Sequence, residues 1–95
     1  MFSRYDMTGN KYDRPTPRIG ELYRHFKGHV YKVLLISRCT ETQQMLISYE
    51  NTEKNGEVWT RPLTMFMGVL GEDPNWCYRF EKIESKVAID LLTNS

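Results

Sequence analysis

The stretch GELYRHFKGHVYKVLLIS, residues 20–37, decides the fold of this 95-residue chain. It contains two runs of strand-forming residues, 20–27 and 30–37, and the second is rich in β-branched and aliphatic side chains. Only Gly28 and His29 separate the runs, and so short a connection predicts a tight β-hairpin. The sequence therefore predicts an antiparallel sheet that starts here.

Outward from this hairpin, short strands continue to alternate with turns. A third strand is expected over residues 45–50, with Met45, Ile47 and Tyr49 on one face. A short fourth strand is expected over 57–61 and a fifth over 76–83, with loops at 40–44, 51–56 and 71–75. Pro62 opens and Gly68 closes a segment with apolar residues at 63, 66 and 67, which predicts one or two helical turns. Five short strands and one helical turn are typical of a small SH3-like barrel, so a mostly β fold is predicted.

The two ends of the chain differ from this predicted barrel domain, which spans residues 19–83. Residues 1–18 contain Gly9, Pro15 and Pro17 without a sustained apolar period, so a flexible N-terminal tail is expected there. Residues 84–95 form a C-terminal segment. Its apolar pattern over 85–92 fits a helix or a strand, and the helix is preferred.

Charge and cysteine usage limit the function classes. Thirteen basic residues against 12 acidic ones give a net charge of +1, which argues against a protein that coats nucleic acid without specificity. Cys39 and Cys77 are expected to be free thiols, and the sequence shows neither a secretory segment nor an apolar run long enough for a membrane span. A cytoplasmic location is therefore expected. A domain this small is also expected to form a homo-oligomer.

Several spaced motifs occur in order between residues 20 and 83. They are Tyr23-Arg24-His25-Phe26-Lys27-Gly28, Tyr31, Glu41, Tyr49, Trp59-Thr60-Arg61-Pro62, Met65-Phe66 and Arg79-Phe80. In these motifs the chain resembles a small family of bacterial and phage proteins that is classed as a domain of unknown function. The resemblance implies the same fold but no settled activity. The chain departs from the family pattern in its N-terminal tail, its C-terminal segment and its expanded loop at 71–76.

The first candidate site residues lie on the first strand. Alternation places Tyr23, His25 and Lys27 on one face of that strand. An aromatic ring, an imidazole and an ammonium group together fit a hydrogen-bonding wall for an anion. The alternative is a solvated face on which Lys27 pairs with a nearby carboxylate.

Arg61 is a second candidate, because it lies just before Pro62 at the junction of strand and helical turn. Its planar guanidinium group suits bidentate binding of phosphate or carboxylate. The alternative is a structural tie from Arg61 to Glu41 or Glu57.

Two aromatic residues, Tyr49 and Trp59, are candidates for stacking on a planar base. Core packing is the commoner role of such rings in a small domain, and partial burial is expected for Trp59. Arg79 lies between Tyr78 and Phe80. It is either a ligand-binding residue or part of a structural ion pair, and the ion pair is preferred.

Metal and acid–base chemistry find little support in the spacing of the residues. His25, His29, Cys39 and Cys77 do not show the spacing of a metal site, so no metal or cofactor is predicted. His25 paired with Glu41 is the one acid–base arrangement considered, and no catalytic residue is assigned.

These observations favour a small-ligand-binding protein for an anionic, nucleotide-like molecule that carries phosphate. From the kind of family that the chain resembles, a phage protein that sequesters a host signalling nucleotide in the host cytoplasm, an anti-defence role, is the expected setting. The predicted ligand-binding residues are His25, Lys27, Arg61, Tyr49, Trp59, Glu41, Tyr23 and Arg79. Because a compact barrel has little interior space, the pocket is expected between subunits or beneath the tail. The alternatives are an SH3-like module for a protein or nucleic acid and a small hydrolase that acts on a nucleotide.

Overall fold

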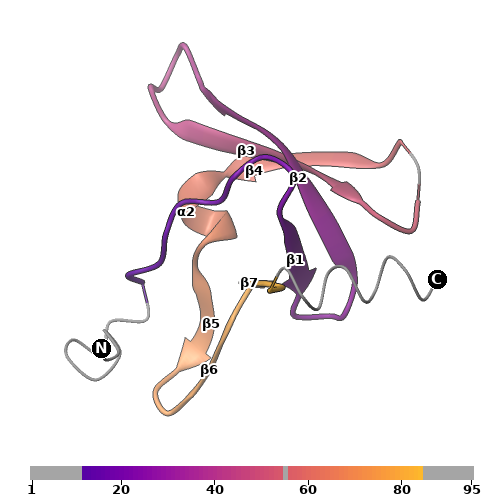
Figure 1. Ribbon diagram of the computed structural model, residues 1–95. Coiled ribbons are helices and arrows are strands. Elements are labelled where there is room, and N and C mark those ends of the chain that lie inside the picture. Colours follow the sequence, from indigo (N-terminus) through magenta and orange to yellow (C-terminus); the bar gives the residue numbers. More distant parts are fainter. Residues whose placement is uncertain (1–11, 55, 85–95) are drawn as a thin grey trace.

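The computed structural model describes residues 12–54 and 56–84, and these fold into a mostly β domain with one short helix (Figure 1). In chain order the elements are β1 (Leu22–His25), β2 (Val30–Arg38), β3 (Met45–Asn51), β4 (Val58–Pro62), α2 (Leu63–Phe66), β5 (Val69–Glu72), β6 (Asn75–Tyr78) and β7 (Phe80–Lys82). The predicted fold class, mostly β with one helical turn, is confirmed.

Five of the strands form one antiparallel sheet in the order β4-β3-β2-β1-β7. The β1–β2 hairpin that the opening stretch predicts is present. Strand β2 is the long central strand, and its register with β3 shifts between Val33 and Leu35. Such a bulge increases the local twist, and in Figure 1 β3 and β4 run across the top of the view while β1 descends.

The turn between β1 and β2 is longer than the two residues predicted. Strand β1 ends at His25, whose amide donates to the carbonyl of His29 at 2.8 Å, while the Gly28 amide donates to the carbonyl of His25 at 2.7 Å. Gly28 has a φ of 109°, which side-chain-bearing residues rarely adopt. Lys27 therefore lies in a four-residue turn and not on the strand face that alternation gave it.

The predicted loop at 71–75 and single strand at 76–83 are wrong. Strands β5 and β6 form a separate hairpin around Asp73-Pro74, and Gly71 allows their close approach, because a Cβ there would collide with the Asn75 carbonyl oxygen. The strand is interrupted at Arg79, whose amide turns back to donate to the Gly68 carbonyl at 3.1 Å. Strand β7 then pairs with β1 at the edge of the large sheet.

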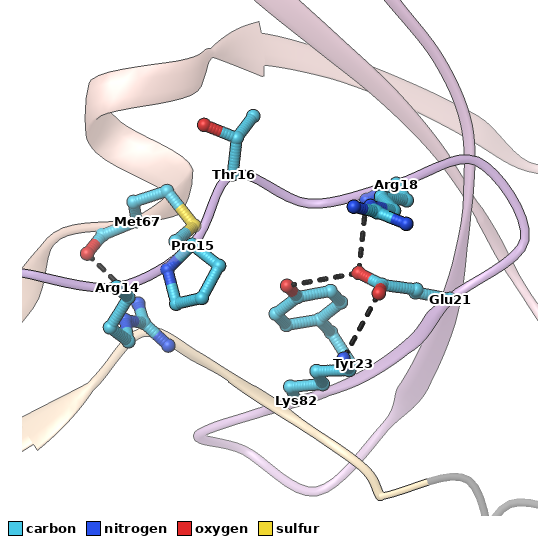
Figure 2. A pocket seen from close by; sticks show the side chains of 8 residues that line it. All are labelled: Arg14, Pro15, Thr16, Arg18, Glu21, Tyr23, Met67 and Lys82. Atoms are coloured by element: carbon cyan, nitrogen blue, oxygen red, sulfur yellow. Dashed lines mark hydrogen bonds and ion pairs between the residues drawn. The ribbon is translucent and has the colours of Figure 1, made fainter. Parts of the chain in front are cut away.

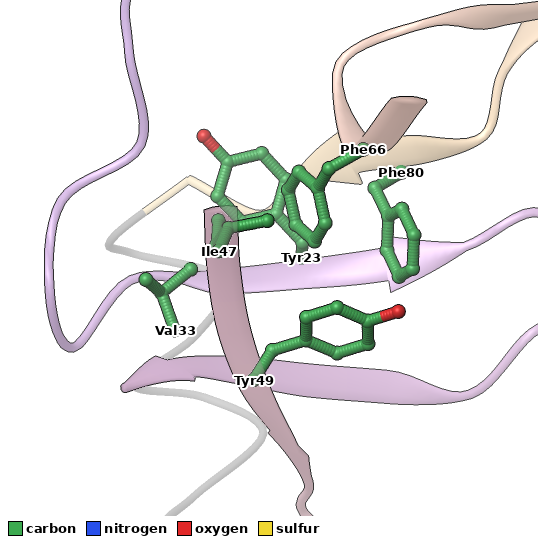
Figure 3. Close-up of a cluster of buried hydrophobic side chains, with 6 residues drawn as sticks. All are labelled: Tyr23, Val33, Ile47, Tyr49, Phe66 and Phe80. Atoms are coloured by element: carbon green, nitrogen blue, oxygen red, sulfur yellow. The ribbon is translucent and has the colours of Figure 1, made fainter. Parts of the chain in front are cut away.

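The hydrophobic core lies on one face of the large sheet, which we call the core face. Its fully or nearly buried members are Tyr23, Val33, Ile47, Tyr49, Phe66 and Phe80 (Figure 3). Phe66, the buried residue of α2, stacks on Phe80 with ring centroids 4.1 Å apart and planes 10° apart. The burial of Ile47 and Tyr49 confirms the predicted alternation of the third strand. The helix thus closes the core over the middle of the sheet.

The N-terminal segment is held to the domain in its described part. The two terminal nitrogens of Arg14 donate to the carbonyls of Phe80 and Met67, both at 2.9 Å, and its guanidinium lies 3.6 Å from the centre of the Tyr78 ring. Pro17 is buried. From Arg14 onward, then, the expected tail lies against the sheet. Residues 1–11 and the predicted helix at 85–92 lie outside the described residues.

Candidate ligand-binding site

A cavity of about 170 Å³ opens on the core face of the large sheet. All five strands of that sheet contribute to its lining. The lining residues are His25 from β1, Tyr31 from β2, Tyr49 from β3, Trp59 and Arg61 from β4, and Phe80 from β7. Directly opposite residues of an antiparallel pair share a face. The register therefore explains why these side chains meet, since Tyr49 lies opposite Trp59 and His25 lies opposite Phe80.

Arg61 is the charged group inside this cavity. Its Nε donates a hydrogen bond of 2.8 Å to the hydroxyl oxygen of Tyr49, and the guanidinium carbon lies 5.7 Å from the centre of the Phe80 ring. Its two terminal nitrogens make no hydrogen bond to any other residue in the described part of the chain. The structural tie to Glu41 or Glu57 is therefore not formed. Glu57 accepts a hydrogen bond from Asn51. The bond from Nε to Tyr49 thus fixes the orientation of the guanidinium fork.

His25 forms a second polar wall. Its Nδ1 accepts a hydrogen bond of 3.2 Å from the Lys27 amide, so the neutral ring carries its proton on Nε2. Burial, followed by the positive charges of Arg61, Lys27, Arg79 and His29, lowers the pKa of His25 below its ordinary value. The ring packs edge-on against Phe80, with centroids 4.8 Å apart. Near neutral pH, His25 is consequently a neutral hydrogen-bond donor in a positive field.

The remaining lining residues are aromatic rings that differ in exposure. Tyr49 is 2% exposed and forms part of the floor with Phe80, whereas Trp59, directly opposite Tyr49 on β4, is 51% exposed. Trp59 is thus an exposed residue, whereas partial burial was expected of it. Tyr31 packs edge-on against both Tyr49 and Phe80, with centroids 5.3 and 5.8 Å away. The cavity therefore has a rigid aromatic floor and one half-exposed ring at its rim.

Four of the eight predicted site residues meet in this cavity, namely His25, Tyr49, Trp59 and Arg61. The other four lie elsewhere. Lys27 is exposed in the β1–β2 turn, and Glu41 is exposed in the β2–β3 turn, where it accepts a hydrogen bond from Thr40. Tyr23 is a core residue, and Arg79 sits between β6 and β7. Of the wall expected from Tyr23, His25 and Lys27, only His25 lines the cavity, where Arg61 joins it.

Two lining residues, Tyr31 and Phe80, were not among the predicted site residues. The position of Tyr31 could have been predicted, because alternation along the second strand places it on the same face as the core residue Val33. Phe80 had no comparable signal. Its place depends on the pairing of β7 with β1, which brings together residues far apart in the chain.

A second cavity, of about 260 Å³, lies beneath the described part of the N-terminal segment. It is lined by Arg14, Pro15, Thr16, Arg18, Glu21, Tyr23, Met67 and Lys82 (Figure 2). The Glu21 carboxylate organises its polar side. It accepts hydrogen bonds from the Arg18 amide at 2.9 Å and from the Tyr23 hydroxyl at 3.4 Å, and it pairs with Lys82 at 3.0 Å. Glu21 thereby joins the N-terminal segment to β1 and β7.

The pairing of Glu21 predicts an acid-sensitive contribution to stability. Burial raises the pKa of Glu21, but the Arg18 amide, Lys82 and Tyr23 outweigh it, and the folded-state pKa falls below the ordinary value of 4.5. A depressed carboxyl pKa stabilises the fold above the unfolded-state pKa, and this contribution is lost as the pH falls through the folded-state pKa. We expect Glu21→Gln to lower the urea midpoint at pH 7, and we expect this deficit to shrink as the pH falls below the ordinary value of 4.5. A deficit that stays constant as the pH falls would contradict this assignment.

The cysteines and the possible metal ligands of the described residues form no further site. Cys39 is partly buried and Cys77 is exposed, and both are free thiols. Within residues 12–54 and 56–84, no group of three His, Cys, Asp or Glu side chains is close enough to hold a metal ion. The only helix in the same ranges, α2, has four residues, too few to cross a bilayer.

Comparison with known proteins places the chain in a family. Residues 21–82 match the model described as "Protein of unknown function (DUF1653)". The chain belongs to this family. Its DUF1653 domain is similar to the crystal structure of a DUF1653 protein from Bordetella bronchiseptica, with 26% identity and a TM-score of 0.58 over 70% of this chain and 87% of that one. No curated protein matches. The DUF1653 match covers all six residues that line the 170 Å³ cavity.

Proposed function

We propose that this DUF1653 protein binds a small anionic ligand that carries a planar ring, such as a nucleotide-derived, phosphate-bearing molecule. The observation that carries the proposal is Arg61, which Tyr49 holds in place over Phe80 in a ring-lined cavity. The hydrogen bond to Nε leaves both terminal nitrogens of the guanidinium for a phosphate or carboxylate, which such a planar fork binds through two parallel bonds.

The positive charge selects the sign of the ligand. A cavity walled by aromatic rings alone suits cations, because the ring faces are electronegative. Here Arg61 lies among the rings, and the positive charges of Lys27 and Arg79 act on the neighbouring His25. A cationic ligand would therefore be repelled, whereas an anion gains a charge-assisted hydrogen bond from Arg61 and a neutral one from His25.

The size of the cavity determines how much of the ligand it holds. A volume of about 170 Å³ is below the roughly 300–1,000 Å³ of pockets that enclose a whole small molecule. It holds one ring or one anionic group, and the rest of the ligand lies over the rim beside the half-exposed Trp59. In this arrangement the ligand stacks on Trp59 while Arg61 binds its phosphate.

Calorimetric titration with a panel of matched compounds tests the proposal. The panel is AMP, GMP, CMP and UMP, with adenosine and inorganic phosphate as partial ligands. Because the site has both a ring contact and an anion contact, we expect at least one monophosphate to bind about tenfold more tightly than either adenosine or phosphate, each of which lacks one contact. The proposal fails if no monophosphate binds or if inorganic phosphate binds as tightly as any of them.

Two further measurements on the same samples separate the alternatives. Mass spectrometry of the ligand after incubation distinguishes sequestration, in which the ligand is recovered intact, from hydrolysis, in which fragments appear. Native mass spectrometry reports the number of subunits and any small molecule that co-purifies. A binding protein that sequesters a signalling nucleotide, the role suggested by the kind of family that the chain resembles, would return intact ligand.

A further inference from the structure

Charged residues flank the strands that line the 170 Å³ cavity. Five strand ends lie together at one end of the antiparallel sheet. They are the ends of β1 and β3 and the starts of β2, β4 and β7. The segments that flank these strand ends carry charges of opposite sign. Glu53 and Glu57 lie in the connection from β3 to β4, which we call the acidic rim. Lys27 in the β1–β2 turn and Arg79 just before β7 form the basic rim.

Glu57 is fixed at the acidic rim beside a lining residue. Its carboxylate accepts a hydrogen bond of 3.2 Å from the side-chain amide of Asn51, which is 3% exposed and lies directly opposite Tyr31 in the register of β2 and β3. Only one carboxylate oxygen is used in this bond, and the other makes no hydrogen bond within the described residues. The acidic rim therefore offers a positioned acceptor next to Tyr31.

The basic rim is joined to the opposite wall of the cavity. The Lys27 amide donates to the imidazole of His25, and the Arg79 carbonyl accepts from the amide of Phe26, next to His25. Arg79 also directly precedes Phe80, whose ring forms part of the cavity floor. Lys27 and Arg79 consequently flank the wall made by His25 and Phe80.

The titration of the two walls agrees with this placement. Burial and then the negative charge of Glu57 raise the pKa of Tyr31. Burial and then the positive charges of Arg61 and Lys27 lower the pKa of His25. Both residues line the same cavity. Glu57 acts on Tyr31, Lys27 acts on His25, and the positive charge of Arg61 acts on both.

We infer that the ligand binds in one orientation and carries a hydrogen-bond-donating amine on its ring, which faces Glu57 while its anionic group faces Arg61 and the basic rim. The inference rests on the proposed function and narrows it to amino-substituted ring anions. A ring with a carbonyl oxygen in the place of the amine would direct a lone pair at the carboxylate of Glu57, and two acceptors that face each other repel.

AMP and IMP test this inference, because they share ribose, phosphate and a purine ring and differ only at positions 6 and 1 of the ring: AMP has an amine beside an unprotonated N1, and IMP has a carbonyl beside an N1–H. By calorimetry we expect wild type to bind AMP about tenfold more tightly than IMP, the effect of one hydrogen bond to a charged group. Glu57→Gln retains an acceptor for Asn51 but removes the charge, so it should reduce the preference for AMP to less than about threefold.

Two control variants sharpen the test. Glu50→Gln removes an acidic residue that alternation places on the opposite face from Tyr49, and it should leave the AMP to IMP ratio unchanged. Arg79→Gln should weaken both nucleotides by a similar factor, because it acts on the shared phosphate. Equal binding of AMP and IMP by wild type overturns the inference and leaves the proposed function intact. A ratio that Glu57→Gln does not change also overturns it. Failure of both AMP and IMP to bind overturns the inference, and the proposed function falls with it only if GMP, CMP and UMP also fail to bind.

Discussion

Replacing Arg61 with alanine is expected to weaken the binding of AMP about 100-fold, which corresponds to about 2.7 kcal/mol. The loss includes two charge-assisted hydrogen bonds to the phosphate and the positive charge that balances it. Arg61→Lys retains the charge but lacks the planar fork, so it should lie between wild type and Arg61→Ala, at a loss of about tenfold. Calorimetric titration of the three proteins measures the series.

The matched control for this series is Arg24→Ala. Arg24 is an exposed residue of β1, and alternation places it on the face opposite Tyr23 and His25, so its removal should leave AMP affinity unchanged. Circular dichroism and the urea midpoint of Arg61→Ala should show a folded protein, since Arg61 is only partly buried. If Arg61→Ala binds AMP as tightly as Arg24→Ala does, the guanidinium does not contact the ligand and the assigned site is wrong.

Replacing Phe66 with alanine is expected to destabilise the fold by about 3–5 kcal/mol, the usual cost of removing a buried phenylalanine. Phe66 is fully buried, stacks on Phe80 at 4.1 Å and contacts the rings of Tyr23 and Tyr49 at 5.1 and 5.2 Å. Small domains have a total unfolding free energy of about 5–15 kcal/mol, so the variant should be marginally folded at 25 °C. Urea unfolding followed by fluorescence measures the loss.

Its neighbour in the same helix supplies the comparison. Met65→Ala removes a side chain that is 48% exposed and should change the free energy of unfolding by less than about 0.5 kcal/mol. Phe66→Leu retains most of the apolar volume and should fall between the two. A Phe66→Ala protein as stable as Met65→Ala would mean that α2 does not close the core.

The elements that could be predicted from the sequence are those that depend on local pattern. The strand-forming run at 30–37, the alternation of Ile47 and Tyr49, and the Pro62 to Gly68 order around the helical turn all reappear in the structure. Local pattern also explains why Arg61 and Trp59 share a face, because they are two residues apart on one strand.

What could not be predicted depends on long-range pairing and on turn length. The β1–β2 turn uses two more residues than the spacing of the two runs suggested, and this removes Lys27 from the strand face. The break at Arg79 depends on a hydrogen bond to the Gly68 carbonyl, which no local pattern encodes. Phe80 reaches the cavity only because β7 pairs with β1. Its partner in that pairing is His25, which lies 55 residues earlier in the chain.

The position of Arg14 affects where the chain can be truncated for experiments. The family match begins at residue 21, so a fragment trimmed to that boundary would lack the guanidinium that donates to the carbonyls of Phe80 and Met67. Phe80 supplies the cavity floor, and Met67 directly follows α2. Trimming would thus leave two backbone acceptors without their donor next to the binding surface. If such a shortened protein bound the ligand poorly, the cause would be a less well held cavity floor. It would not be the loss of a residue that contacts the ligand.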